Sequence, residues 1–227
     1  MSRFAFTPAD TPSLPILDED VLFPVRRIYC VGRNYAAHRR EMGGGDDREP
    51  PFFFAKPPDA ATPPGRAIAY PSQTSELHHE VELVVALGGG GEKIEADVAP
   101  GLVLGYAVGV DLTRRDLQHA ARAKGQPWEA AKSFDQSAPI SAIRRAADAP
   151  PRGRIRLSVN GSARQDARLQ DMIWSVPEII SQASRLWRLQ PGDLIFTGTP
   201  EGVGPLLRGD QVDCAIEGVG ELNFEIT

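Results

Sequence analysis

The feature that most constrains this chain is an Asn160-Gly161 pair between two runs of strand-forming residues, 155–159 and 162–166. Asn-Gly favours the type I′ turn of a two-residue β-hairpin, because both of its residues tolerate the positive φ angles that this turn requires. The pair therefore predicts an antiparallel hairpin and commits this part of the chain to a β-sheet.

Other short apolar or alternating runs, bounded by glycine, proline or charged residues, predict further strands. These runs are residues 28–32, 52–55, 67–70, 80–87, 102–110, 193–197, 211–216 and 222–226. Three short helices are predicted at residues 35–42, at residues 112–124 and from the capping box of Ser175 and Glu178 to about Trp187. The pattern predicts an α+β fold in which a large mixed β-sheet is rolled or folded on itself.

The domain organisation follows from length and proline content. A chain of 227 residues suits one sizeable domain rather than two. Residues 1–24 are rich in proline and have no clear periodicity, so we expect an extended arm there and a single domain at residues 25–227. The glycine-rich, acidic stretch 43–51 is predicted to be a mobile loop.

Glu80 and Glu82 share one face of the predicted strand 80–87, because side chains alternate with period two along a strand. The opposite face is apolar. A solvated outer face is one interpretation of this pair, and a bound cation is the other. Asp111, which ends the glycine-containing apolar run 102–110, adds a third carboxylate. Three hard oxygen ligands favour Mg²⁺ or Mn²⁺ over zinc, with open positions for water or substrate.

His38 and Glu41 are three residues apart on a predicted short helix, so they lie on one face within hydrogen-bonding reach. A carboxylate bonded to one imidazole nitrogen fixes the tautomer and leaves the other nitrogen to take a proton from water. The pair is therefore either an ordinary surface pair or a general base with its orienting residue.

Four more residues are candidates for contacts with an anionic substrate. Lys132 lies in a small and apolar stretch, where a buried lysine needs an anionic partner. Arg115 and Gln118, three apart on a predicted helix, face the same way and could hold a carboxylate. Thr199 follows a strand in a glycine-containing turn, where backbone N–H groups and a hydroxyl can meet an anion. Taken singly, Arg115 and Gln118 are more often surface residues, and the motif around Thr199 is a weak signal on its own.

Composition argues against several classes of function. The formal net charge of −5 disfavours a nucleic-acid or anionic-membrane surface. Cys30 and Cys214 lack the spacing of a zinc site or a disulfide framework. No apolar run reaches the ~18 residues of a membrane span, and the N-terminus has no signal-peptide pattern. We expect a cytoplasmic protein with no nucleic-acid or membrane partner.

Motifs in a fixed order over residues 27–226 combine these candidates with their neighbours. They are Val31-Gly-Arg-Asn-Tyr35 with His38 and Glu41, His78-His-Glu-Val-Glu82, Gly105-Tyr106 through Asp111 to Arg115-Asp-Leu-Gln118, Lys132-Ser-Phe134, Leu157-Ser-Val-Asn-Gly161, and Gly192-Asp193 with Thr197-Gly-Thr-Pro-Glu-Gly-Val-Gly204. This set resembles the fumarylacetoacetate hydrolase superfamily, specifically its short acylpyruvase-type members.

The resemblance implies a mixed β-roll of the superfamily's C-terminal-domain type with a few short helices, usually homodimeric, with residues 25–227 as one catalytic domain. It implies that Mg²⁺ or Mn²⁺ is held by Glu80, Glu82 and Asp111. His38, oriented by Glu41, would activate a water, and Lys132 would stabilise enolate or carboxylate charge. The residues implied to contact substrate are Arg115, Gln118 and Thr199.

Phe4-Ala-Phe6 and the stretch 22–33 are similar to bacterial members that hydrolyse fumarylpyruvate in gentisate catabolism. This narrower resemblance implies metal-dependent cleavage of a C–C bond in a 2,4-dioxo acid, with fumarate and pyruvate as products. The far carboxylate of such a small 2-oxo diacid needs a cation, for which Arg33, Arg39 and Arg40 are candidates.

Three other functions compete with this expectation. The superfamily also contains oxaloacetate decarboxylases and isomerase/decarboxylases of hydroxymuconate-type diacids, which use the same metal and enolate chemistry. His38 and Glu41 favour hydrolysis over isomerisation, because pure isomerisation needs proton transfer but no activated water; such a pair can also serve decarboxylation. A non-catalytic small-molecule binding protein is the third, and it would be expected to have lost part of this polar set.

Overall fold

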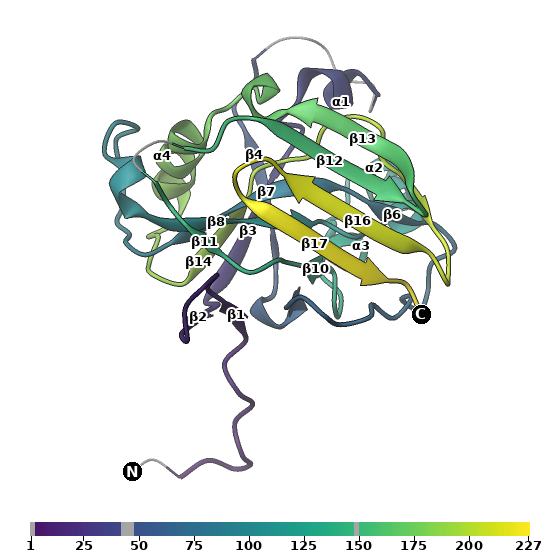
Figure 1. Ribbon diagram of the computed structural model, residues 1–227, viewed down its shortest axis with the longest axis horizontal. Coiled ribbons are helices and arrows are strands. Elements are labelled where there is room, and N and C mark those ends of the chain that lie inside the picture. The colour runs from purple at the N-terminus through teal and green to yellow at the C-terminus, as the bar shows by residue number, and fades with distance from the viewer. Residues whose placement is uncertain (1–2, 42–47, 148–149) are drawn as a thin grey trace.

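Two β-sheets lie face to face in the computed structural model, which describes residues 3–41, 48–147 and 150–227 apart from the side chain of Arg39 (Figure 1). The larger sheet has six strands in the order β11, β8, β7, β14, β3, β4. They are β3 (Arg27–Gly32), β4 (Phe52–Lys56), β7 (Val81–Leu87), β8 (Val103–Val110), β11 (Arg144–Arg145) and β14 (Asp193–Phe196). Because β14 is parallel to β3 and antiparallel to β7, the sheet is mixed, as predicted.

The second sheet is antiparallel and contains the hairpin that the sequence predicts. Its order is β13, β12, β16, β17. The strands are β12 (Arg154–Val159), β13 (Ser162–Arg168), β16 (Gln211–Ile216) and β17 (Gly220–Glu225). Asn160 and Gly161 connect β12 to β13 with φ angles of 51° and 75°, the signs that a type I′ turn requires.

Three smaller pairings complete the β structure. A three-stranded sheet has the order β15, β6, β9, and two pairs join β1 to β2 and β10 to β5. Their strands are β1 (Ser13–Pro15), β2 (Leu22–Pro24), β5 (Ala61–Thr62), β6 (Leu77–His79), β9 (Thr113–Arg114), β10 (Ala138–Pro139) and β15 (Gly204–Leu206). Together with the short helices they confirm the α+β class.

The helices are short. They are α1 (Ala36–Glu41), α2 (Arg115–Ala123), α3 (Glu129–Lys132) and α4 (Val176–Leu186), with 3₁₀ turns at Pro58–Ala60, Ala99–Leu102 and Leu169–Asp171. The predicted capping box opens α4, since the backbone N–H and hydroxyl of Ser175 donate to Glu178 Oε2 at 2.9 and 2.7 Å. No helix in the described part of the chain is long and apolar enough to cross a membrane.

Apolar side chains pack on both faces of the six-stranded sheet. Val81, Leu83 and Val85 of β7 belong to the larger core, which includes residues of the four-stranded sheet. Val84 and Ala86 of the same strand belong to a second core on the opposite face. All of β7 is therefore buried, so any polar side chain on it needs a partner inside the protein.

The N-terminal residues differ from the expected arm. Residues before β1 extend away from the body, as Figure 1 shows, but β1 and β2 pair as an antiparallel hairpin. Leu14 and Phe23 of this hairpin are 0% and 3% exposed and belong to the second core. The sequence predicts no regular element in residues 1–24, because it has no periodicity there. Local periodicity does not reveal which apolar residues cover a distant sheet.

Two other predicted elements also differ. Residues 67–70 form no strand, and Ile68 makes only an isolated bridge to Ile226. The helix predicted at residues 112–124 begins at Arg115, because Thr113 and Arg114 pair with β6 as β9. In both places tertiary pairing overrides the local pattern.

Candidate active site

Glu80, Glu82 and Asp111 come together at one end of the six-stranded sheet. Glu80 precedes β7 and Asp111 follows its antiparallel neighbour β8, so the two meet, and the Asp111 N–H donates to the Glu80 carbonyl at 2.8 Å. One carboxylate oxygen from each of the three residues lies within 4.8 Å of the others. They are 5%, 2% and 1% exposed, so the interpretation as a solvated outer face is wrong.

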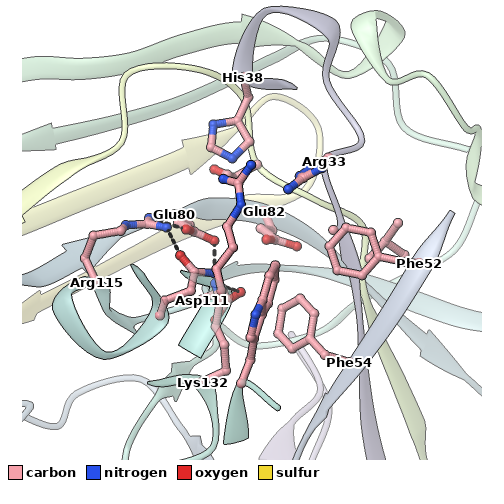
Figure 2. Close-up of a pocket in the computed structure, with 15 residues that line it drawn as sticks. Arg33, His38, Phe52, Phe54, Glu80, Glu82, Asp111, Arg115 and Lys132 are labelled. Atoms are coloured by element: carbon pink, nitrogen blue, oxygen red, sulfur yellow. Dashed lines mark hydrogen bonds and ion pairs between the residues drawn. The ribbon is translucent and has the colours of Figure 1, made fainter. Parts of the chain in front are cut away.

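Three buried cations surround these carboxylates, and Figure 2 shows two of them, Arg115 and Lys132. Lys132 Nζ donates to Glu80 Oε2 at 2.8 Å and to Asp111 Oδ2 at 2.7 Å. Arg115 donates to Glu80 Oε1, and Lys56 Nζ lies 2.8 Å from Asp111 Oδ1. The anionic partner that a buried Lys132 needs is therefore a pair of carboxylates of the protein itself.

Glu82 differs from the other two carboxylates in its electrostatic environment. Burial acts to raise the pKa of Glu80, but the charges of Lys132 and Arg115 lower it overall. The pKa of Glu82 is well above its ordinary value, because the side chain is buried and lies beside Asp111 and Glu80. No ion pair of Glu82 occurs among the described residues, and its Oε2 accepts the Gly198 N–H at 2.6 Å. A cation bound at Glu82 would remove this electrostatic penalty.

The donor set fits a hard divalent metal ion. All three groups are carboxylates, the ligands that Mg²⁺ and Mn²⁺ prefer. Asp111 Oδ1 is buried and accepts no aligned hydrogen bond, although Lys56 Nζ lies near it, so a lone pair on this oxygen is available to a metal. Neither His78 nor His79 belongs to the cluster, which disfavours zinc.

His38 and Glu41 are paired as predicted. Both residues lie on α1, and His38 Nδ1 is 3.0 Å from Glu41 Oε2. His38 is 5% exposed and lines the same pocket as Glu80 and Glu82, and Figure 2 shows its ring facing the carboxylates. Because Nδ1 is used by Glu41, Nε2 is the nitrogen left to act on a reactant.

The residues predicted to contact substrate line this pocket too. Arg115 and Gln118 face the same way on α2, and Arg115 donates a hydrogen bond to Gln118 Oε1. Thr199 Oγ1 donates to the Val81 carbonyl at 2.8 Å and accepts from Gln165 Nε2 at 2.8 Å. The pocket thus holds a hydroxyl, an amide and a guanidinium beside the carboxylates.

The turn after β14 is predicted to bind an anion. Its backbone N–H at Gly198 instead donates to a carboxylate of the protein, that of Glu82. Gly198 has a φ of +94°, and a Cβ there would lie 2.6 Å from the Asn34 Cβ, so only glycine suits this position. Its N–H points to Glu82. The amide of Asn34 donates to the Thr197 and Trp174 carbonyls at 2.8 and 2.9 Å and fixes the turn against α1.

Arg33 also lines the pocket, beside His38 (Figure 2). It follows β3 with a φ of 59°, an uncommon conformation for a residue with a side chain. Arg40 is exposed on α1. The Arg39 side chain and residues 42–47, which carry most of the predicted mobile loop, lie outside the described part of the chain.

Sequence reasoning missed five residues of this site. The pocket is also lined by Phe52, Phe54, Arg122 and Trp128, and Lys56 lies behind Asp111. The sequence does contain a pattern that could have identified Lys56. Like Lys132, it is a lone lysine after an apolar run, where a buried lysine needs an anionic partner. Arg122 is four residues along α2 from Gln118, on the face that turns to the pocket.

Comparison with known proteins gives a family and close relatives. The family model described as the C-terminal region of fumarylacetoacetate hydrolase matches residues 27–227. A fumarylpyruvate hydrolase of a Ralstonia species is 44% identical over 163 residues, 71% of this chain and 85% of that protein. The mitochondrial oxaloacetate tautomerase FAHD1 of Mus musculus is 44% identical over 203 residues, 88% of this chain and 91% of that protein.

A solved structure is similar over nearly the whole chain. The fumarylpyruvate hydrolase of Pseudomonas aeruginosa, in complex with Mn²⁺ and pyruvate, matches with a TM-score of 0.96 and 51% identity over 99% of each chain. Its Mn²⁺ and the carboxylate cluster described above confirm the expectation of a Mg²⁺ or Mn²⁺ cofactor.

Proposed function

Because the chain belongs to the fumarylacetoacetate hydrolase family, we propose that it hydrolyses a C–C bond of a 2,4-dioxo acid and that its substrate is fumarylpyruvate. The observation that carries this proposal is the meeting of the His38–Glu41 pair and the carboxylate cluster in one pocket. A base that activates water beside a site for a 2-oxo acid is the arrangement that this hydrolysis needs.

We assign the metal to Glu80, Glu82 and Asp111. A Mg²⁺ or Mn²⁺ ion bound there would supply Lewis-acid stabilisation of negative charge on the oxygens of the 2-oxo acid. Arg115, Gln118 and Thr199 would contact the proximal carboxylate and keto oxygens, because all three line the same space beside the carboxylates.

His38 Nε2 takes a proton from the attacking water, while Glu41 holds the ring and stabilises the imidazolium that forms. The hydroxide adds to the carbonyl carbon C4, and the bond between C3 and C4 breaks. Fumarate leaves from the C4 side, and the electron pair stays on the pyruvate side as an enolate, which Lys132 stabilises and which takes a proton at C3. Arg33 holds the far carboxylate of the substrate.

A second candidate function is supported by the mouse oxaloacetate tautomerase, which is as similar in identity as the Ralstonia hydrolase. Oxaloacetate would bind through the same 2-oxo acid end. It lacks an acyl chain that could reach along the pocket, and its tautomerisation needs no attacking water. The two candidates therefore differ in their need for His38 as a base toward water.

The test is pyruvate release by the purified protein from fumarylpyruvate, acetylpyruvate and oxaloacetate, with Mg²⁺ and with EDTA. We expect fast, metal-dependent release from fumarylpyruvate. Preference for oxaloacetate, or no pyruvate at all, would contradict the proposal. His38→Ala should still bind Mn²⁺, measured by calorimetry, while hydrolysis is lost; hydrolysis at the parent rate would refute the role of His38.

We also propose that the protein is a homodimer, as the family resemblance implies. Light scattering coupled to size-exclusion chromatography would test this, because a dimer has twice the 24.6 kDa of the chain.

A further inference from the structure

Three aromatic side chains form one side of the pocket between the carboxylate cluster and Arg33. They are Phe52, Phe54 and Trp128, here called the aromatic wall. Phe52 and Phe54 are alternate residues of β4, so both point to the same face of that strand. Trp128 comes from the residue before α3, which carries Lys132. Two distant segments therefore build the wall.

Contacts along the wall are continuous from one end to the other. Lys132 Nζ lies 5.1 Å from the centre of the Phe54 ring. The Phe54 and Trp128 rings are 6.1 Å apart and the Trp128 and Phe52 rings 5.4 Å apart, the latter meeting edge to face at 88°. At the far end, the Arg33 guanidinium lies 5.7 Å from the centre of the Phe52 ring. The wall thus connects the group that stabilises the enolate with a cation.

The backbone is adapted to hold Phe52 in this place. A Cβ on Gly32 would overlap the Phe52 ring, so the absence of a side chain at Gly32 leaves the space that the ring occupies. Phe52 is 37% exposed in this structure although it is a large apolar residue. An exposed aromatic ring in a pocket is available to pack against a ligand.

We infer that the aromatic wall selects a flat, conjugated acyl group, and that Trp128 is the specificity-determining residue at its centre. The inference rests on the proposed function, because the wall lies where the acyl chain of a 2,4-dioxo acid must extend from Lys132. Ring edges and faces pack closely on a planar π system, whereas a saturated chain is puckered and makes poorer contact. Arg33 at the end of the wall fits a terminal carboxylate.

The test uses two diacid substrates of equal length, fumarylpyruvate and its saturated analogue succinylpyruvate. They carry the same far carboxylate and differ by one C=C bond. Their intrinsic reactivities also differ, but this difference is the same for every enzyme variant and cancels when variants are compared. The measured quantity is the ratio of kcat/KM for the two substrates.

Trp128→Leu should lower this ratio by about threefold to tenfold, the size of aromatic packing effects. Gly32→Ala should lower it in the same direction, because the added methyl group displaces Phe52. Trp187→Leu is the matched control. Trp187 packs on Tyr29 and on Phe53, which points to the face of β4 opposite Phe52 and Phe54, and it is not among the residues lining the pocket, so the ratio should stay unchanged.

A matching substitution tests the far end separately. Arg33→Gln should slow both diacids relative to acetylpyruvate by at least about tenfold and leave the ratio between the diacids unchanged. An active wild-type enzyme whose ratio is unaffected by Trp128→Leu would overturn the inference. A wild-type protein that hydrolyses no acylpyruvate would overturn the proposed function instead. If Gly32→Ala does not fold, the ratio of kcat/KM values measured for Trp128→Leu tests the inference by itself.

Discussion

Lys56 gives the sharpest prediction about stability, because its charge is buried and its partners are known. Its side chain is fully inaccessible, and Nζ lies 2.8 Å from Asp111 Oδ1. The same ammonium donates to the Leu112 carbonyl at 3.2 Å and to the Lys132 carbonyl. Lys56→Met keeps most of the side-chain volume but removes the charge and all three interactions.

Removing one partner of a buried ion pair costs about 3–5 kcal/mol. Asp111 keeps its contact with Lys132 in Lys56→Met, but only Lys132 and Arg115 then remain to compensate three buried carboxylates. In a chain of this size each kcal/mol corresponds to about 2–4 °C, so we expect the Tm to fall by about 6–20 °C. By contrast, an exposed pair such as Arg154 with Asp166 contributes only about 0–1 kcal/mol. The size of the loss in stability therefore distinguishes a stabilising buried ion pair from an exposed pair that contributes little.

The assay is urea denaturation and thermal unfolding, each in EDTA and in Mg²⁺. Lys124→Met is the control, since it makes the same change at an exposed position. The deficit of Lys56→Met should be smaller in Mg²⁺, because a cation bound to Asp111 restores part of the lost attraction. A loss in EDTA no larger than that of Lys124→Met would refute the reasoning.

Three further predictions concern the metal and the site's scaffold. Glu82→Ala should abolish metal-dependent turnover and weaken Mn²⁺ binding measured by calorimetry; unchanged activity with excess metal would contradict the metal assignment. EDTA should lower the Tm by only about 5–10 °C and leave the far-ultraviolet circular dichroism unchanged, because Lys56, Arg115 and Lys132 already compensate Glu80 and Asp111. Asn34→Ala should destabilise the protein by about 2–4 kcal/mol in urea, since it removes three hydrogen bonds of a buried amide; a loss below about 0.5 kcal/mol would show that these bonds do not hold the turn.

A few neighbouring residues determine several features of this protein. The turn at Asn160-Gly161, the capping box of Ser175 and the alternation along β7 all form as predicted. The contact of His38 with Glu41 also follows from spacing on one helix. Each depends on backbone geometry over at most a few residues, so a single sequence contains the information.

Only the tertiary structure decided which faces of the strands are buried and which segments pack on them. Alternation places Glu80 and Glu82 on one side of a strand, but only the second core beneath the sheet removes that side from water. Lys56 and Lys132 reach Asp111 from segments far apart in the chain, and Trp128 meets Phe52 in the same way. Burial and ion pairing depend on distant segments packing together, and the periodicity of any one segment carries no record of its partners.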